Sequence, residues 1–106
     1  MDVQTLFRYI RENNEKKVKK ALKDGFDVNT QNENGVTAII VAANDGTTYR
    51  SNDMVKLIMS YNPDLSLKNI MKMDVFDLCS DKSILNLLKH PGLKKLGKYA
   101  DLLGDY

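Results

Sequence analysis

Tryptophan is absent from this chain of 106 residues, and cysteine and histidine occur once each. A single cysteine, Cys79, excludes an intramolecular disulfide and leaves no pair of thiolates to bind a metal. With one histidine, His90, no nucleophile, base and orienting group can be assembled. The sequence therefore predicts a protein that is not an enzyme and holds no cofactor or metal.

Long apolar runs and clustered glycines are also missing. The longest apolar run, residues 38–43, is far shorter than the ~20 residues that a membrane helix needs, and the N-terminus lacks the basic and apolar stretches of a signal peptide. No glycine cluster resembles a phosphate-binding loop. We expect one cytoplasmic domain over residues 1–106 with no membrane partner.

Amphipathic periodicity is present and predicts short helices. Apolar residues at intervals of three and four predict helices over 3–12 and 15–23, with a break at Asn13 and Asn14. Gly25 suits the left-handed residue that ends the second helix. The polar residues 26–36 predict a turn-rich segment.

Three more helices are predicted from their caps. Thr37 should cap the apolar run that follows it, Asp53 the helix over 54–61, and Asp74 a short helix before the break at Ser80. A last helix is expected over 83–89. The side chains that we expect to be buried are those of Leu6, Ile10, Val18, Leu22, Ile39, Ala42, Val55, Ile58, Phe76, Leu78, Leu85 and Leu88.

The chain also contains an internal repeat. VKKALKDGFDVN at 18–29 aligns with VKLIMSYNPDLS at 55–66, an offset of 37, and a turn and a capped helix follow each copy. The pattern N-x-x-G-x-T-A-I-x-x-A-A at 32–43 resembles the start of an ankyrin repeat, and GFDVN at 25–29 resembles its end. The family period is 33, and a four-residue insertion between Gly46 and Met54 accounts for the difference.

This resemblance implies an all-α fold, a short ankyrin-repeat solenoid of stacked helix-turn-helix units with projecting turns. It implies a capping repeat over 1–30, a full repeat over 31–67 and a shortened repeat over 68–90, with an extension over 91–106 that has room for one more helix. The third unit departs from the pattern, with Lys72 where the family has glycine and Asp74 where it has threonine. Erosion of this kind is normal at the end of a stack.

By resemblance, the function is non-catalytic binding of another protein, as a small adaptor or a stoichiometric inhibitor, including neutralisation of a toxin or a host factor. The positions that correspond to the exposed variable residues of the family, with two from the insertion, are Arg11, Glu12, Glu33, Asn34, Val36, Asn44, Asp45, Tyr49, Arg50, Ile70, Met71 and Met73.

Two features leave alternatives open. Ile70, Met71 and Met73 are apolar residues in an expected turn, and they either form a hydrophobic contact patch or fold back as core. Lysines cover the helix over 15–23 and the segment 82–100, and they form a solvated surface, a nucleic-acid patch or a site for an acidic protein. Scarce arginine and aromatic residues make nucleic acid the less favoured partner. Weak self-association through the end of the stack is a third alternative.

Overall fold

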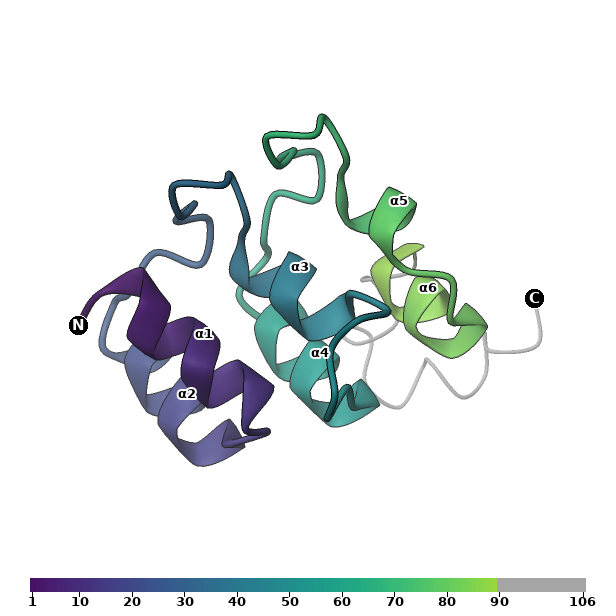
Figure 1. The fold of residues 1–106 in the computed structure, drawn as a ribbon. Coiled ribbons are helices and arrows are strands. Elements are labelled where there is room, and N and C mark those ends of the chain that lie inside the picture. Colours follow the sequence, from purple (N-terminus) through teal and green to yellow (C-terminus); the bar gives the residue numbers. More distant parts are fainter. Residues whose placement is uncertain (90–106) are drawn as a thin grey trace.

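The computed structural model describes residues 1–89, and within this range the chain is all-helical (Figure 1). The predicted extension over 91–106 and its helix lie outside the described residues. The six helices are α1 (Val3–Arg11), α2 (Glu15–Lys23), α3 (Ala38–Ala43), α4 (Asn52–Met59), α5 (Val75–Leu78) and α6 (Lys82–Lys89). No helix among the described residues is both long and apolar enough to cross a membrane.

The helices lie in two rows. An inner row holds α1, α3 and α5, and an outer row holds α2, α4 and α6 (Figure 1). Within the inner row α3 packs between α1 and α5, and within the outer row α4 packs between α2 and α6. Contacts between α1 and α2 and between α3 and α4 join the rows. The connections from α2 to α3 and from α4 to α5 project on the same side of the molecule (Figure 1).

The cap residues explain where most helices begin. The side chain of Thr37 accepts a hydrogen bond from the Ile40 amide, and Asp74 forms a reciprocal capping box with Asp77. The prediction for α4 was wrong. Ser51 caps this helix, since its Oγ accepts a hydrogen bond from the Met54 amide at 3.1 Å, and Asp53 lies in the first turn.

One continuous core runs between the rows, and nine of the twelve predicted core residues are buried in it. The three corrections are Phe76, Leu78 and Leu85, which are only half-buried. In their place, α5 buries Val75, the residue that ends this helix, Cys79, is also buried, and α6 buries Ile84 and Leu88. Ile84 and Leu88 are four positions apart, so α6 buries one narrow stripe and leaves its flanking apolar residues half-exposed.

Candidate functional site

The second projecting turn, residues 69–73, carries the predicted apolar patch. The Oδ1 atom of Asn69 accepts hydrogen bonds from the Met71 amide at 2.9 Å and the Met73 amide at 3.1 Å. The Asn69 amide donates to the Met73 carbonyl, which closes the turn. Ile70 and Met71 are 69% and 71% exposed, whereas Met73 is half-buried. The tip of this turn therefore holds two adjacent apolar side chains in solvent.

The first projecting turn, residues 32–36, has the same construction 37 residues earlier. Asn32 is equivalent to Asn69, and its Oδ1 accepts hydrogen bonds from the Asn34 and Val36 amides, both at 2.9 Å. Glu33 and Asn34 are exposed at the positions of Ile70 and Met71. The two turns thus present different side chains, one pair polar and one pair apolar, on the same backbone framework.

Direct contacts hold the two turns side by side. The Ile70 amide donates to the Asn34 carbonyl at 2.9 Å. Gly35 has a φ of +74°, and a Cβ at this position would lie 2.9 Å from both the Asn69 Cα and the Lys68 carbonyl oxygen. Glycine is therefore required both by the backbone conformation and by the close approach of the second turn.

A shallow groove lies beside the first turn. It has a volume of about 390 Å³, and its lining comes from the end of α1, the face of α3 and the inserted loop. The lining residues are Arg11, Val36, Val41, Asn44, Gly46, Thr47, Thr48 and Tyr49. Four of these are predicted contact residues, and Tyr49 is 64% exposed. Val36 belongs to both surfaces, because it ends the first turn and lines the groove.

Asp45 and Arg50, also predicted contacts, are engaged in an intramolecular network. The guanidinium of Arg50 lies 2.6 Å from the Asp45 carboxylate and 3.4 Å from that of Asp81. Asp45 also accepts hydrogen bonds from the amide and hydroxyl of Ser80. The bonds from Ser80, and then the bond from Arg50, lower the pKa of Asp45. This network ties the inserted loop to the segment between α5 and α6.

One predicted contact residue, Glu12, belongs to neither turn, nor to the groove, nor to the Asp45–Arg50 network. Glu12 is exposed and caps the C-terminus of α1. The sequence analysis missed four residues of the groove lining, Val41, Gly46, Thr47 and Thr48. The two threonines belong to the segment containing the insertion, so the excess loop length was a usable signal.

Potential metal ligands and the single cysteine are the chemically reactive groups to consider among the described residues. No group of three or more His, Cys, Asp or Glu side chains within 1–89 could hold a metal ion. Cys79 is buried, and burial raises the pKa of its thiol, which lowers its reactivity. His90, Lys94, Lys95 and Lys98 lie outside the described residues. No family model matches this chain, and no curated protein sequence is significantly similar to it.

Proposed function

We propose that this chain is a short stack of ankyrin-type repeats that binds another protein and carries no catalytic site. The equivalent hydrogen bonds of the two turns at an offset of 37 and the two rows of helices support the repeat interpretation. Backbone atoms of the second turn lie against Gly35 and leave no room for a side chain. The equivalent residue of the second turn, Lys72, has a φ of +62° and an exposed side chain. A side chain is tolerated there because no further projecting turn lies against it among residues 1–89.

The observation that carries the binding function is the exposed pair Ile70 and Met71. Exposure of large apolar side chains to water is unfavourable, and burying the pair in an interface would lower the free energy. The hydrogen bonds of Asn69 already order this turn, so binding would cost little additional backbone entropy. A flexible methionine also adapts to the shape of its partner.

The groove next to the first turn extends this surface. Tyr49 and Arg11 supply the aromatic and cationic side chains that are enriched at interface hot spots. Asp45 and Arg50 would act as positioning residues that hold the inserted loop, and with it Tyr49, over α3. A partner protein could contact both the apolar tip of the second turn and the groove. Binding at two surfaces is consistent with an adaptor or with a stoichiometric inhibitor of a toxin or a host factor.

A double variant tests this function. Ile70→Ser with Met71→Gln should leave the melting temperature within a few degrees, because substitutions at exposed sites usually change stability by about ±0.5 kcal/mol. Tagged wild-type protein, this variant and a Lys82→Ser control would be used for affinity purification from the native source, followed by quantitative mass spectrometry. We expect at least one partner protein to be enriched with the wild type and with the Lys82→Ser control, and to be absent from the purification with the double variant.

Two outcomes would contradict the proposal. If the double variant unfolds, its residues belong to the core and the exposed tip is not a binding site. If no protein is lost selectively, the tip makes no specific contact. Sedimentation velocity separates self-association from binding of another protein, because a concentration-dependent mass that disappears in the double variant would assign the tip to contacts between copies.

A further inference from the structure

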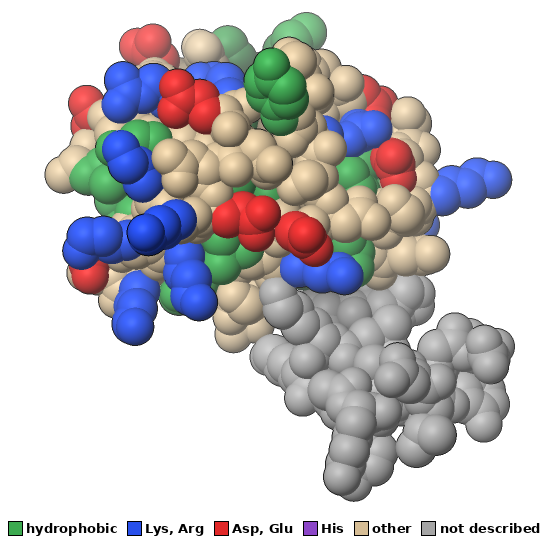
Figure 2. Space-filling view, turned by 90° about the horizontal axis from the view of Figure 1, so that it is seen from below, with side chains coloured by type: hydrophobic (Ala, Val, Ile, Leu, Met, Phe, Trp, Pro, Cys, Tyr) green, Lys and Arg blue, Asp and Glu red, His purple; other side chains and the backbone are tan. Residues whose placement is uncertain are grey.

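Charge is strongly segregated between the outer helices and the rest of the described chain. Helices α2, α4 and α6 contain eight lysines and two carboxylates, a formal charge of +6. All other residues within 1–89 contain five basic and ten acidic side chains, a formal charge of −5. The eight lysines are all exposed. Figure 2 shows that most of the Lys and Arg side chains of the face seen from below gather toward its left end, with fewer at the other end.

Helix α2 contributes most of this charge. It holds five lysines, of which Lys20 pairs with Asp24 at 3.0 Å and Lys17 lies over the ring of Tyr9. Lys16, Lys19 and Lys23 make no ion pair or side-chain hydrogen bond with residues 1–89. Like charges on successive turns of one helix repel each other, which an anionic partner would relieve.

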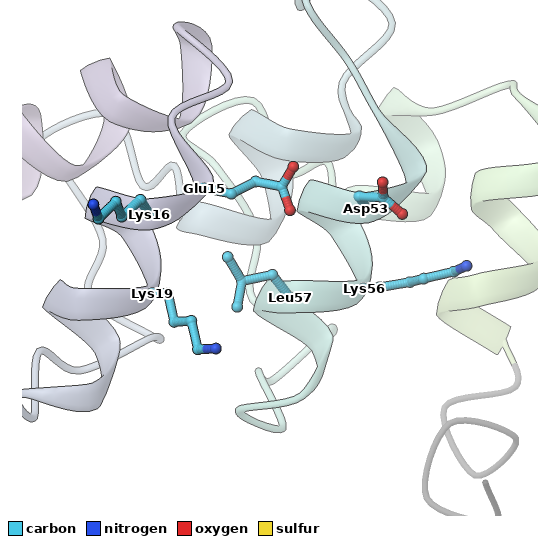
Figure 3. Close-up of a pocket in the computed structure, with 6 residues that line it drawn as sticks. All are labelled: Glu15, Lys16, Lys19, Asp53, Lys56 and Leu57. Carbon is cyan, nitrogen blue, oxygen red and sulfur yellow. The ribbon is translucent and has the colours of Figure 1, made fainter.

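A groove of about 510 Å³ separates α2 from α4 beside these lysines. Half-buried Leu57 forms its apolar middle (Figure 3). The carboxylates of Glu15 and Asp53 lie at one end, and Lys19 extends toward the other. The groove therefore combines an apolar contact with a cationic side and a small acidic end.

We propose that the groove between α2 and α4 is a second docking surface, and that it takes an acidic segment of a partner protein with an aliphatic side chain between its carboxylates. The aliphatic side chain would cover Leu57, and the carboxylates would meet Lys19 in the groove and Lys16 at its outer edge. This surface lies on the outer row, so the inference does not depend on the function proposed for the projecting turns.

The groove chemistry favours protein over nucleic acid. Glu15 and Asp53 would repel phosphates at one end of the groove, whereas a peptide can place an amide or a basic side chain there. Nucleic-acid grooves use aromatic side chains as stacking platforms, and none lines this one. Burial of a leucine-like side chain against the apolar middle of the groove is favourable, whereas a phosphate backbone makes no favourable contact there.

The test uses the full chain and three labelled probes in fluorescence anisotropy. The first probe is a short peptide in which glutamates flank a pair of leucines, the second replaces the leucines with serines, and the third is a DNA duplex of equal charge. We expect the leucine peptide to bind most tightly. Lys16→Glu with Lys19→Glu should weaken it about tenfold, and Leu57→Ser should weaken it severalfold.

A charge-matched control is available on the projecting side. Lys68→Glu with Lys72→Glu changes the net charge equally and should alter peptide affinity less than about twofold, because these lysines lie outside the groove. Three results would overturn the proposal. The first is an equal loss of affinity for the leucine peptide in the two double lysine variants, and the second is equal affinity for the leucine and serine peptides. The third is that the duplex binds more tightly than the leucine peptide and that Leu57→Ser does not change its affinity. Failure of all probes to bind would overturn it as well.

Discussion

Replacing Gly35 with alanine tests how the two projecting turns are held together. The φ of +74° at Gly35 costs an L-residue about 1–2 kcal/mol. The new Cβ would also lie 2.9 Å from the Asn69 Cα and the Lys68 carbonyl oxygen, which are backbone atoms and move only if the second turn shifts. Overpacking of this kind adds about 1–3 kcal/mol. We therefore expect Gly35→Ala to lower the free energy of unfolding by about 2–5 kcal/mol.

Two other glycines separate these contributions. Gly25 has a φ of +103°, and a Cβ added there would meet no atom within 4 Å, so Gly25→Ala should show the backbone cost alone. Gly46 has no positive φ and no close backbone neighbour, so Gly46→Ala should stay within about ±0.5 kcal/mol. Urea unfolding followed by far-ultraviolet circular dichroism measures all three. Equal losses for Gly35→Ala and Gly25→Ala would refute the close approach of the turns.

Three further predictions concern the helix cap, the turn and the salt-bridge network. Ser51→Ala should cost about 1 kcal/mol in urea unfolding through loss of the α4 cap, and an equal or larger loss for Asp53→Ala would contradict this cap. Lys72→Gly should raise stability by about 0.5–1 kcal/mol, because relief of the left-handed strain exceeds the entropy cost of glycine, and a lowered urea midpoint would count against it. The folded pKa of Asp45 lies below the ordinary value of 3.8, so its contribution is present above about pH 4 and is lost as the pH falls through the lowered pKa. Asp45→Asn should therefore reduce stability at neutral pH, with a difference from the wild type that shrinks in acid, and a constant difference would contradict the bonds to Ser80.

The helices could be predicted from the sequence because their signals are local. Asn14, Thr37 and Asp74 each precede a helix and each accepts a hydrogen bond from its first turn. The α4 cap could not be decided in the same way. Ser51 and Asp53 are both good cap residues, and the course of the inserted loop selects between them.

The candidate surfaces were harder to predict because they depend on stacking. Neither the composition nor the spacing decided whether Ile70 and Met71 fold inward, because the position of their turn depends on contacts with the first turn, among them the bond from the Ile70 amide to the Asn34 carbonyl. The network of Asp45, Arg50 and Asp81 joins two loops that are distant in the sequence. Its geometry exists only after the helix pairs have packed against each other.

Site-specific photo-crosslinking at residue 71 tests the central claim most directly. A photoreactive amino acid would replace Met71 in the full chain, expressed in its native source, and a second chain would carry it at Lys82 as a control for random collisions. We predict one discrete adduct with another protein from position 71, absent from position 82 and lost when Ile70→Ser is added. The same adducts from both positions, or no adduct from position 71, would contradict partner binding through this turn.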